Sequence, residues 1–208
     1  MNKDDKIIIV VKRENLFGEE TFQGFRLHNE VDYESRILRN LEGMRRGDAE
    51  INPEYKQPIA YIIVSNPDKR VLTYQRAKKD EHYGEKRLQG KWSWGVGGHI
   101  DDEEINHQNP LHSSLSRELE EEVGLDIDEC KLEVLGYIND DSNSVGQVHF
   151  GILYLAKTNK EVKPVDPEIV SCSFKSLKEL EEICQSCDVE TWSQIALPVV
   201  RKHFEKVN

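Results

Sequence analysis

Apolar residues along the chain repeat with two periods, one typical of strands and one typical of helices. Strand-like runs lie at residues 7–11, 22–27, 61–64, 71–75, 92–96, 132–138 and 145–156. Helical spacing predicts helices at residues 34–44 and 110–123, one through residues 177–187, and one through residues 192–204 that Pro198 should kink or divide. This mixture predicts an α/β protein, with a mixed sheet that carries helices on both faces.

The segment of residues 110–123 has the clearest helical pattern. Asn109 is a good N-cap, Pro110 suits the first helical position, and Gly124 suits the position after the last turn. One apolar stripe runs along the predicted helix, formed by Leu111, Leu115, Leu119 and Val123. We therefore expect this helix to pack against the core along that stripe.

Three carboxylates of the same helix fall within one quadrant of its surface. Glu118, Glu121 and Glu122 stand at positions i, i+3 and i+4, which are neighbours on a helix. A hard divalent cation would relieve their mutual repulsion, because Mg²⁺ and Mn²⁺ take oxygen ligands and often act beside phosphates. Glu120 points to the far side and is expected to be solvated. The pattern predicts a metal-dependent site for phosphate chemistry.

Residues 98–125 resemble the sequence box of the Nudix hydrolase (MutT-like) family, G-x5-E-x7-R-E-U-x-E-E-x-G-U, in which U is aliphatic. Glu104 stands six positions after Gly98, as the box requires, but twelve residues rather than seven separate it from Arg117. The other matching positions are Gly98, Arg117, Glu118, Leu119, Glu121, Glu122, Gly124 and Leu125. The lead-in at residues 95–100, Gly-x-Gly-Gly-His-Ile, is similar to a bacterial branch described as predicted Nudix phosphoesterases.

The five extra residues leave two positions that could take the role of the upstream glutamate, which in the family braces the box arginine. Glu104 keeps the distance to Gly98, whereas Asn109 keeps the distance to Arg117 but carries no charge. Because Asn109 suits a helix start, we assign it to capping and assign Glu104 to pairing with Arg117. Residues 105–108 then form an outward bulge.

The resemblance implies a fold and a reaction. The fold would be the Nudix α/β/α sandwich, and the reaction would be hydrolysis of a nucleoside diphosphate linked to another group. Mg²⁺ or Mn²⁺ would be held by the three box glutamates and by a carbonyl near Gly98. The family often adds an acid or base from a downstream loop, for which the candidates are Asp140, Asp141, His149 and Glu168.

Two rival functions remain beside hydrolysis. A catalytically silent Nudix-fold nucleotide sensor would keep the sheet and lose the glutamate trio, whereas the trio is intact here. Isopentenyl diphosphate isomerase would show a cysteine in an Asn-x-Cys-Cys-x-His-Pro context, and none of the four cysteines has it. Cys184 and Cys187 extend an apolar helical stripe, so we interpret them as small core residues.

The length of 208 residues suits one core of ordinary size. We expect an N-terminal extension at residues 1–56, packed on a Nudix domain at residues 57–208. No apolar run approaches membrane-spanning length, and the run at residues 7–11 is too short for a signal peptide, which predicts a soluble, cytoplasmic protein. A homodimer is left open by the sequence.

Charge along the chain points to the kind of partner. The net charge of −11 argues against a nucleic acid. Residues 98–125 carry −7, whereas residues 76–91 carry +3. A basic segment next to a metal site suits a small phosphorylated substrate, and we expect Arg76, Arg87 and Lys91 to contact it.

Overall fold

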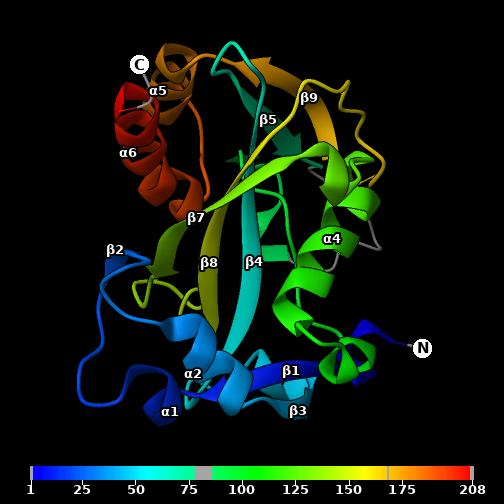
Figure 1. Ribbon diagram of the computed structural model, residues 1–208, viewed down its shortest axis with the longest axis vertical. Coiled ribbons are helices and arrows are strands. Elements are labelled where there is room, and N and C mark those ends of the chain that lie inside the picture. The colour runs from blue at the N-terminus through cyan, green and yellow to red at the C-terminus, as the bar shows by residue number, and fades with distance from the viewer. Residues whose placement is uncertain (1, 78–85, 168, 207–208) are drawn as a thin grey trace. The chain divides into compact units, whose positions relative to one another are not determined.

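The protein is described here by a computed structural model that covers residues 2–77, 86–167 and 169–206 (Figure 1). The chain divides into two compact units. The first holds the residues up to 61 together with residues 97–116 and 134–153, and the second holds residues 62–96, residues 117–133 and the residues from 154 onwards. Each unit is built from three separate stretches of sequence, so neither follows the predicted boundary between residues 56 and 57, and that boundary stays a prediction.

The strands of the described residues pair into one sheet. Its central order is β2-β7-β8-β4-β1-β3, and β5 pairs with β4, β6 and β9. The strands are β1 (Ile7–Lys12), β2 (Gly24–Leu27), β3 (Glu42–Arg45), β4 (Tyr55–Ser65), β5 (Val71–Arg76), β6 (Trp92–Ser93), β7 (Lys131–Asn139), β8 (His149–Lys157) and β9 (Ile169–Lys175). The predicted α/β class with a mixed sheet is confirmed.

The described residues also form six α-helices and four short 3₁₀ turns. The helices are α1 (Arg13–Phe17), α2 (Tyr33–Arg39), α3 (Arg46–Ala49), α4 (Pro110–Val123), α5 (Leu177–Ser186) and α6 (Thr191–Lys206). The 3₁₀ turns are η1 (Lys3–Asp5), η2 (Lys86–Leu88), η3 (Asp102–Asn106) and η4 (Ile127–Glu129). Within the described ranges, no helix combines the length and the apolar character needed to cross a membrane.

An aromatic cluster and strand pairing hold the N-terminal residues in the first unit. Strand β1 pairs antiparallel with both β3 and β4. Phe17, Tyr33 and Phe150 meet with ring centroids 5.2–6.0 Å apart, and Tyr33 also lies edge-on to Tyr137 at 4.9 Å. Such aromatic pairs contribute about 0.5–1.5 kcal/mol each beyond their buried area. The N-terminal segment is therefore part of this unit's core.

A buried polar network organises the second unit. The indole Nε1 of Trp94 donates to the Ser193 carbonyl at 2.7 Å, and the Ser93 hydroxyl donates to Glu190 at 3.0 Å. Glu190 also receives a hydrogen bond from Arg76, so its buried carboxylate is compensated. Trp94 is only 1% exposed and packs in the core.

Several predicted elements have different limits in the structure. The helix predicted at residues 34–44 is wrong beyond Arg39, because the chain turns at Asn40 and enters β3 at Glu42. The strand predicted from residue 145 begins instead at His149, because side-chain hydrogen bonds fold the preceding residues into a tight loop. Strand β9 was not predicted, since its pairing with β5 is a tertiary contact.

The C-terminal helices also correct two expectations. Helix α6 continues without a break through Pro198, so the proline does not divide it. Cys187 is the exposed C-cap of α5, and its predicted place in the core is wrong.

Candidate active site

Helix α4, green in Figure 1, carries the predicted carboxylates and begins and ends where the sequence indicates. The Asn109 side chain accepts a hydrogen bond from the backbone N–H of His112 at 3.2 Å, which confirms its capping role. Pro110 is the first helical residue. At the other end Gly124 adopts a φ of +65°, a left-handed conformation that stops the helix at low cost for glycine.

The acidic side chains of α4 differ in solvent exposure because one face of the helix packs against the core. Its stripe is at most 1% exposed at every position, namely Leu111, Leu115, Leu119 and Val123. Next to this stripe Glu118 is 8% exposed and Glu122 is half-buried, whereas Glu120 and Glu121 are exposed. Glu120 is thus solvated surface, as expected. The buried stripe fixes the direction in which Glu118 and Glu122 project.

Arg117 joins two carboxylates of the trio. Its Nη1 donates to Glu118 Oε1 at 2.6 Å and to Glu121 Oε2 at 3.2 Å. One guanidinium among three carboxylates leaves a formal net charge of −2, with Glu118 almost removed from water. An all-oxygen donor set of this charge fits a hard divalent cation. Assignment of the trio as metal ligands stays a prediction.

The glycine loop before α4 is held by close backbone contact. Gly97 has a φ of +141°, and a Cβ added there would lie 1.7 Å from the carbonyl oxygen of Ala60. Residue 97 must therefore be glycine for the loop to approach β4 this closely. The predicted ligand role of the Gly98 carbonyl is a separate matter and stays a prediction.

The extra residues of the box lie at the end of the 3₁₀ turn η3 and just after it. Glu104 is 5% exposed, and its Oε2 accepts a hydrogen bond from the backbone N–H of Asp101 at 2.8 Å within η3. Residues 106–108 are exposed, as expected for an outward insertion. A buried carboxylate needs compensation, which suits the brace predicted for Glu104. Its pairing with Arg117 stays a prediction.

The basic residues upstream of the box have partners within the protein. Arg76 pairs with Glu190, and its guanidinium carbon lies 5.5 Å from the Tyr74 ring centroid. Lys91 Nζ lies 4.0 Å from Asp188 Oδ1, whereas Arg87 is exposed on η2. The rest of this basic segment, residues 78–85, lies outside the described residues. Contacts of Arg76, Arg87 and Lys91 with a substrate stay predictions.

The downstream acid–base candidates organise their own loop. Asp140 accepts hydrogen bonds from Gln23, Ser142 and Asn143. Asp141 accepts hydrogen bonds from Arg13 and from Lys56 Nζ, the latter at 2.8 Å. Burial alone would raise the pKa of Asp141, but these two cations lower it to about 2. Both aspartates are thus engaged in structure, which argues against a base role, and Glu168 lies outside the described residues.

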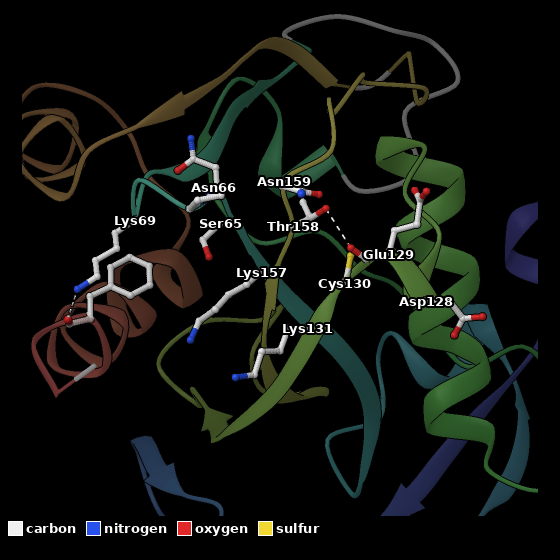
Figure 2. Close-up of a pocket in the computed structure, with 12 residues that line it drawn as sticks. Ser65, Asn66, Lys69, Asp128, Glu129, Cys130, Lys131, Lys157, Thr158 and Asn159 are labelled. Atoms are coloured by element: carbon white, nitrogen blue, oxygen red, sulfur yellow. Dashed lines mark hydrogen bonds between the residues drawn. The ribbon is translucent and has the colours of Figure 1, made fainter. Parts of the chain in front are cut away.

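A pocket in the second unit contains none of the box residues (Figure 2). It has a volume of about 560 Å³ and is lined by the end of β4, the start of β7 and the end of β8. Lys69 Nζ donates to the Phe204 carbonyl at 2.8 Å, and Lys157 Nζ lies 3.2 Å from Glu133 Oε2. Two of its three lysines thus contact groups of the protein itself, and the placing of the chemistry on α4 stays a prediction.

These observations define a class of protein. It has an α/β fold in which the sequence R-E-L-x-E-E-x-G-L covers the last turns of an amphipathic helix and the glycine that ends it. Residues 55–192 match the family model of the NUDIX domain. The chain belongs to the Nudix family. Membership implies a pyrophosphohydrolase reaction in general terms, and the predicted Nudix fold is confirmed.

Individual relatives agree with this assignment. Protein YmaB of Bacillus subtilis (strain 168) is 36% identical over 211 residues, which covers 96% of this chain and 100% of YmaB. The crystal structure of Tm1382, a candidate Nudix hydrolase, is 29% identical with a TM-score of 0.77, covering 96% of this chain and 100% of that one. The NUDIX domain of Shewanella oneidensis NrtR, complexed with ADP ribose, shares the fold at 16% identity and a TM-score of 0.54, covering 72% of this chain and 88% of the NrtR chain.

Proposed function

We propose that the protein is a Mg²⁺- or Mn²⁺-dependent hydrolase of a phosphoanhydride bond. Its substrate class would be a nucleoside diphosphate linked to another group, or a related small diphosphate. The observation that supports this most is the arrangement on α4, where Arg117 bridges Glu118 and Glu121 while Glu122 remains beside the buried stripe. A silent sensor would have no need of that acidic set.

In this proposal Glu118, Glu121 and Glu122 hold the metal, and the Gly98 carbonyl adds a further oxygen. When bound, the ion would polarise phosphate oxygens and lower the pKa of a coordinated water. Glu118 and Glu122 are directed by packing, so their carboxylates need little reorganisation. Glu121 is exposed and is the ligand most free to turn.

Arg117 has a positioning role in the proposal. Its guanidinium lies between two carboxylates that would otherwise repel each other, and it holds both on one side of the helix. Glu104 would brace this arginine from η3. These contacts would hold the side chains of Glu118 and Glu121 in place before a metal ion binds.

The exposed cation Arg87, with Lys91 and Arg76 nearby in sequence, is proposed to attract the phosphates of a small substrate. We infer a cytoplasmic protein that acts on a soluble metabolite. Nucleic acid is a poor partner for a chain of net charge −11.

A substrate panel tests the proposal. The tag-free full chain is incubated with nucleoside di- and triphosphates, nucleotide sugars, dinucleotides, ADP-ribose and non-nucleotide diphosphates, with Mg²⁺ or Mn²⁺. We expect hydrolysis of at least one diphosphate, and complete loss of that hydrolysis when EDTA is in excess. Binding without turnover across the panel would support the silent sensor instead, and turnover unaffected by chelation would overturn the metal requirement.

A further inference from the structure

Three potential metal ligands from separate segments meet in the first unit. They are Glu50 after α3, His99 in the loop before η3, and His149 at the start of β8. Their ligand atoms all lie within 4.8 Å of one another. Nε2 of His99 lies 3.2 Å from Nε2 of His149, and the two nitrogens lie 3.8 and 3.9 Å from Glu50 Oε1.

Hydrogen bonding fixes which nitrogen of His149 faces the group. Its Nδ1 lies 2.7 Å from the carbonyl oxygen of Val145. A carbonyl can only accept, so Nδ1 carries a proton, and Nε2 is the nitrogen left to offer a lone pair to a metal ion. A backbone carbonyl behind a metal-binding imidazole is the usual arrangement that sets its orientation.

Several electron-pair donors converge on His99. Besides His149 and Glu50, the side-chain oxygen of Gln57 lies 2.7 Å from His99 Nε2, and Gln57 is 1% exposed. A proton on His99 Nε2 can point at only one of these atoms. A cation can face all of them at once, which makes this group better suited to an ion than to a single hydrogen bond.

The spacing fits a transition-metal ion. Two nitrogens bound about 2.0–2.1 Å from one tetrahedral ion stand about 3.3 Å apart, close to the 3.2 Å between the imidazoles. The carboxylate of Glu50 would have to move inwards by about half an ångström to match. Two imidazoles with one carboxylate favour Zn²⁺, Mn²⁺ or Fe²⁺ over Mg²⁺ and Ca²⁺, which prefer all-oxygen sets.

The surrounding structure holds these ligands in place. Lys56 is fully buried, and its Nζ donates to the carbonyls of Gly146 and His149 at 2.7 and 3.2 Å. His99 is fixed by a backbone bridge between its own residue and Ile59 of β4. The competing explanation is that Glu50 pairs with Arg46, the first residue of α3, whose Nε lies 3.7 Å from Glu50 Oε1. That weak pair accounts for neither histidine.

We propose that Glu50, His99 and His149 form a binding site for one divalent first-row metal ion such as Zn²⁺. The site is composed of residues other than the box glutamates. The binding of metal at this site can therefore be tested separately from the proposed hydrolase activity.

Metal binding tests this directly. The tag-free full chain is stripped of metal, titrated with Zn²⁺ by calorimetry, and checked for bound zinc by mass spectrometry after dialysis. We expect one zinc equivalent that Glu121→Gln retains and that His149→Gln weakens at least tenfold. His112→Gln, an exposed histidine on α4, is the matched control and should bind as the wild type does.

A second readout separates ligation from folding. Co²⁺ bound in place of zinc should give a visible absorption spectrum that His149→Gln changes and that Glu121→Gln leaves unaltered. If circular dichroism shows that His149→Gln is unfolded, Glu50→Gln takes its place with the same expected loss. Equal zinc affinity in the wild type and in the folded variant, or loss of zinc in Glu121→Gln, would overturn the proposal.

Discussion

At the scale of single residues, Glu121 offers the sharpest test of the acidic set on α4. Its side chain is 61% exposed, so Glu121→Gln should leave the fold intact while it removes one charged metal ligand. We expect kcat to fall about a hundredfold or more. Glu120→Gln, which alters an exposed neighbour on the far side, should keep wild-type turnover. Wild-type turnover of Glu121→Gln at limiting Mg²⁺ would count against the ligand assignment.

Variants of Glu104 and Asn109 should distinguish the predicted brace on Arg117 from the N-cap of α4. Asn109→Ala removes the acceptor for the His112 N–H and should cost about 1 kcal/mol of unfolding free energy with little effect on turnover. Glu104→Gln should reduce both activity and stability moderately, because the predicted ionic brace on Arg117 loses one partner. Urea denaturation and steady-state kinetics measure the two effects. An unchanged kcat in Glu104→Gln would remove Glu104 from the site.

At the scale of elements, the loop between β7 and β8 should respond to acid through Asp141. The folded pKa of Asp141 is about 2, against an ordinary value of 3.8. A depressed carboxyl pKa contributes stability that is present above pH 4 and is lost as the pH falls towards 2. Asp141→Asn should thus be less stable than the wild type at neutral pH.

The difference between the two proteins should shrink as the pH falls from about 4 to 2. Asp128→Asn, at an exposed aspartate of η4, is the control. The measurement is the unfolding free energy of both proteins in urea across this pH range. A difference that stays constant with pH would show that Arg13 and Lys56 do not stabilise the Asp141 carboxylate.

The elements that the sequence predicted best are those whose signals are local. Helix α4 has its cap, its stripe and its stop signal within sixteen residues, and all of them act as expected. The start of β8 is set by hydrogen bonds of the Asn143 side chain in the preceding loop, which the period of apolar residues does not report. Strand β9 depends on its pairing with the distant strand β5, so no local period could indicate it. The same applies to Arg76, whose partner Glu190 lies far along the chain.

For the whole molecule, the mixture of strand and helix periods was enough to predict the α/β class. The box sequence was enough to predict the Nudix family, because its nine defined positions must agree on one loop and helix. It could not indicate the cluster of Glu50, His99 and His149. These residues lie about fifty positions apart, and only folding brings them together. Substrate identity also depends on side chains from several segments, so it must come from experiment.

In the proposed reaction, metal held by the acidic set of α4 would direct water at a phosphoanhydride. This reaction is tested most directly by hydrolysing the preferred diphosphate in ¹⁸O-labelled water with Mg²⁺, and by locating the label in the products by ³¹P NMR and mass spectrometry. We expect cleavage between two phosphates, with one ¹⁸O in one product phosphate, no reaction in EDTA, and turnover by Glu121→Gln that is lower by about a hundredfold or more. Turnover by Glu121→Gln at the wild-type rate, or cleavage without label at phosphorus, would contradict the proposal.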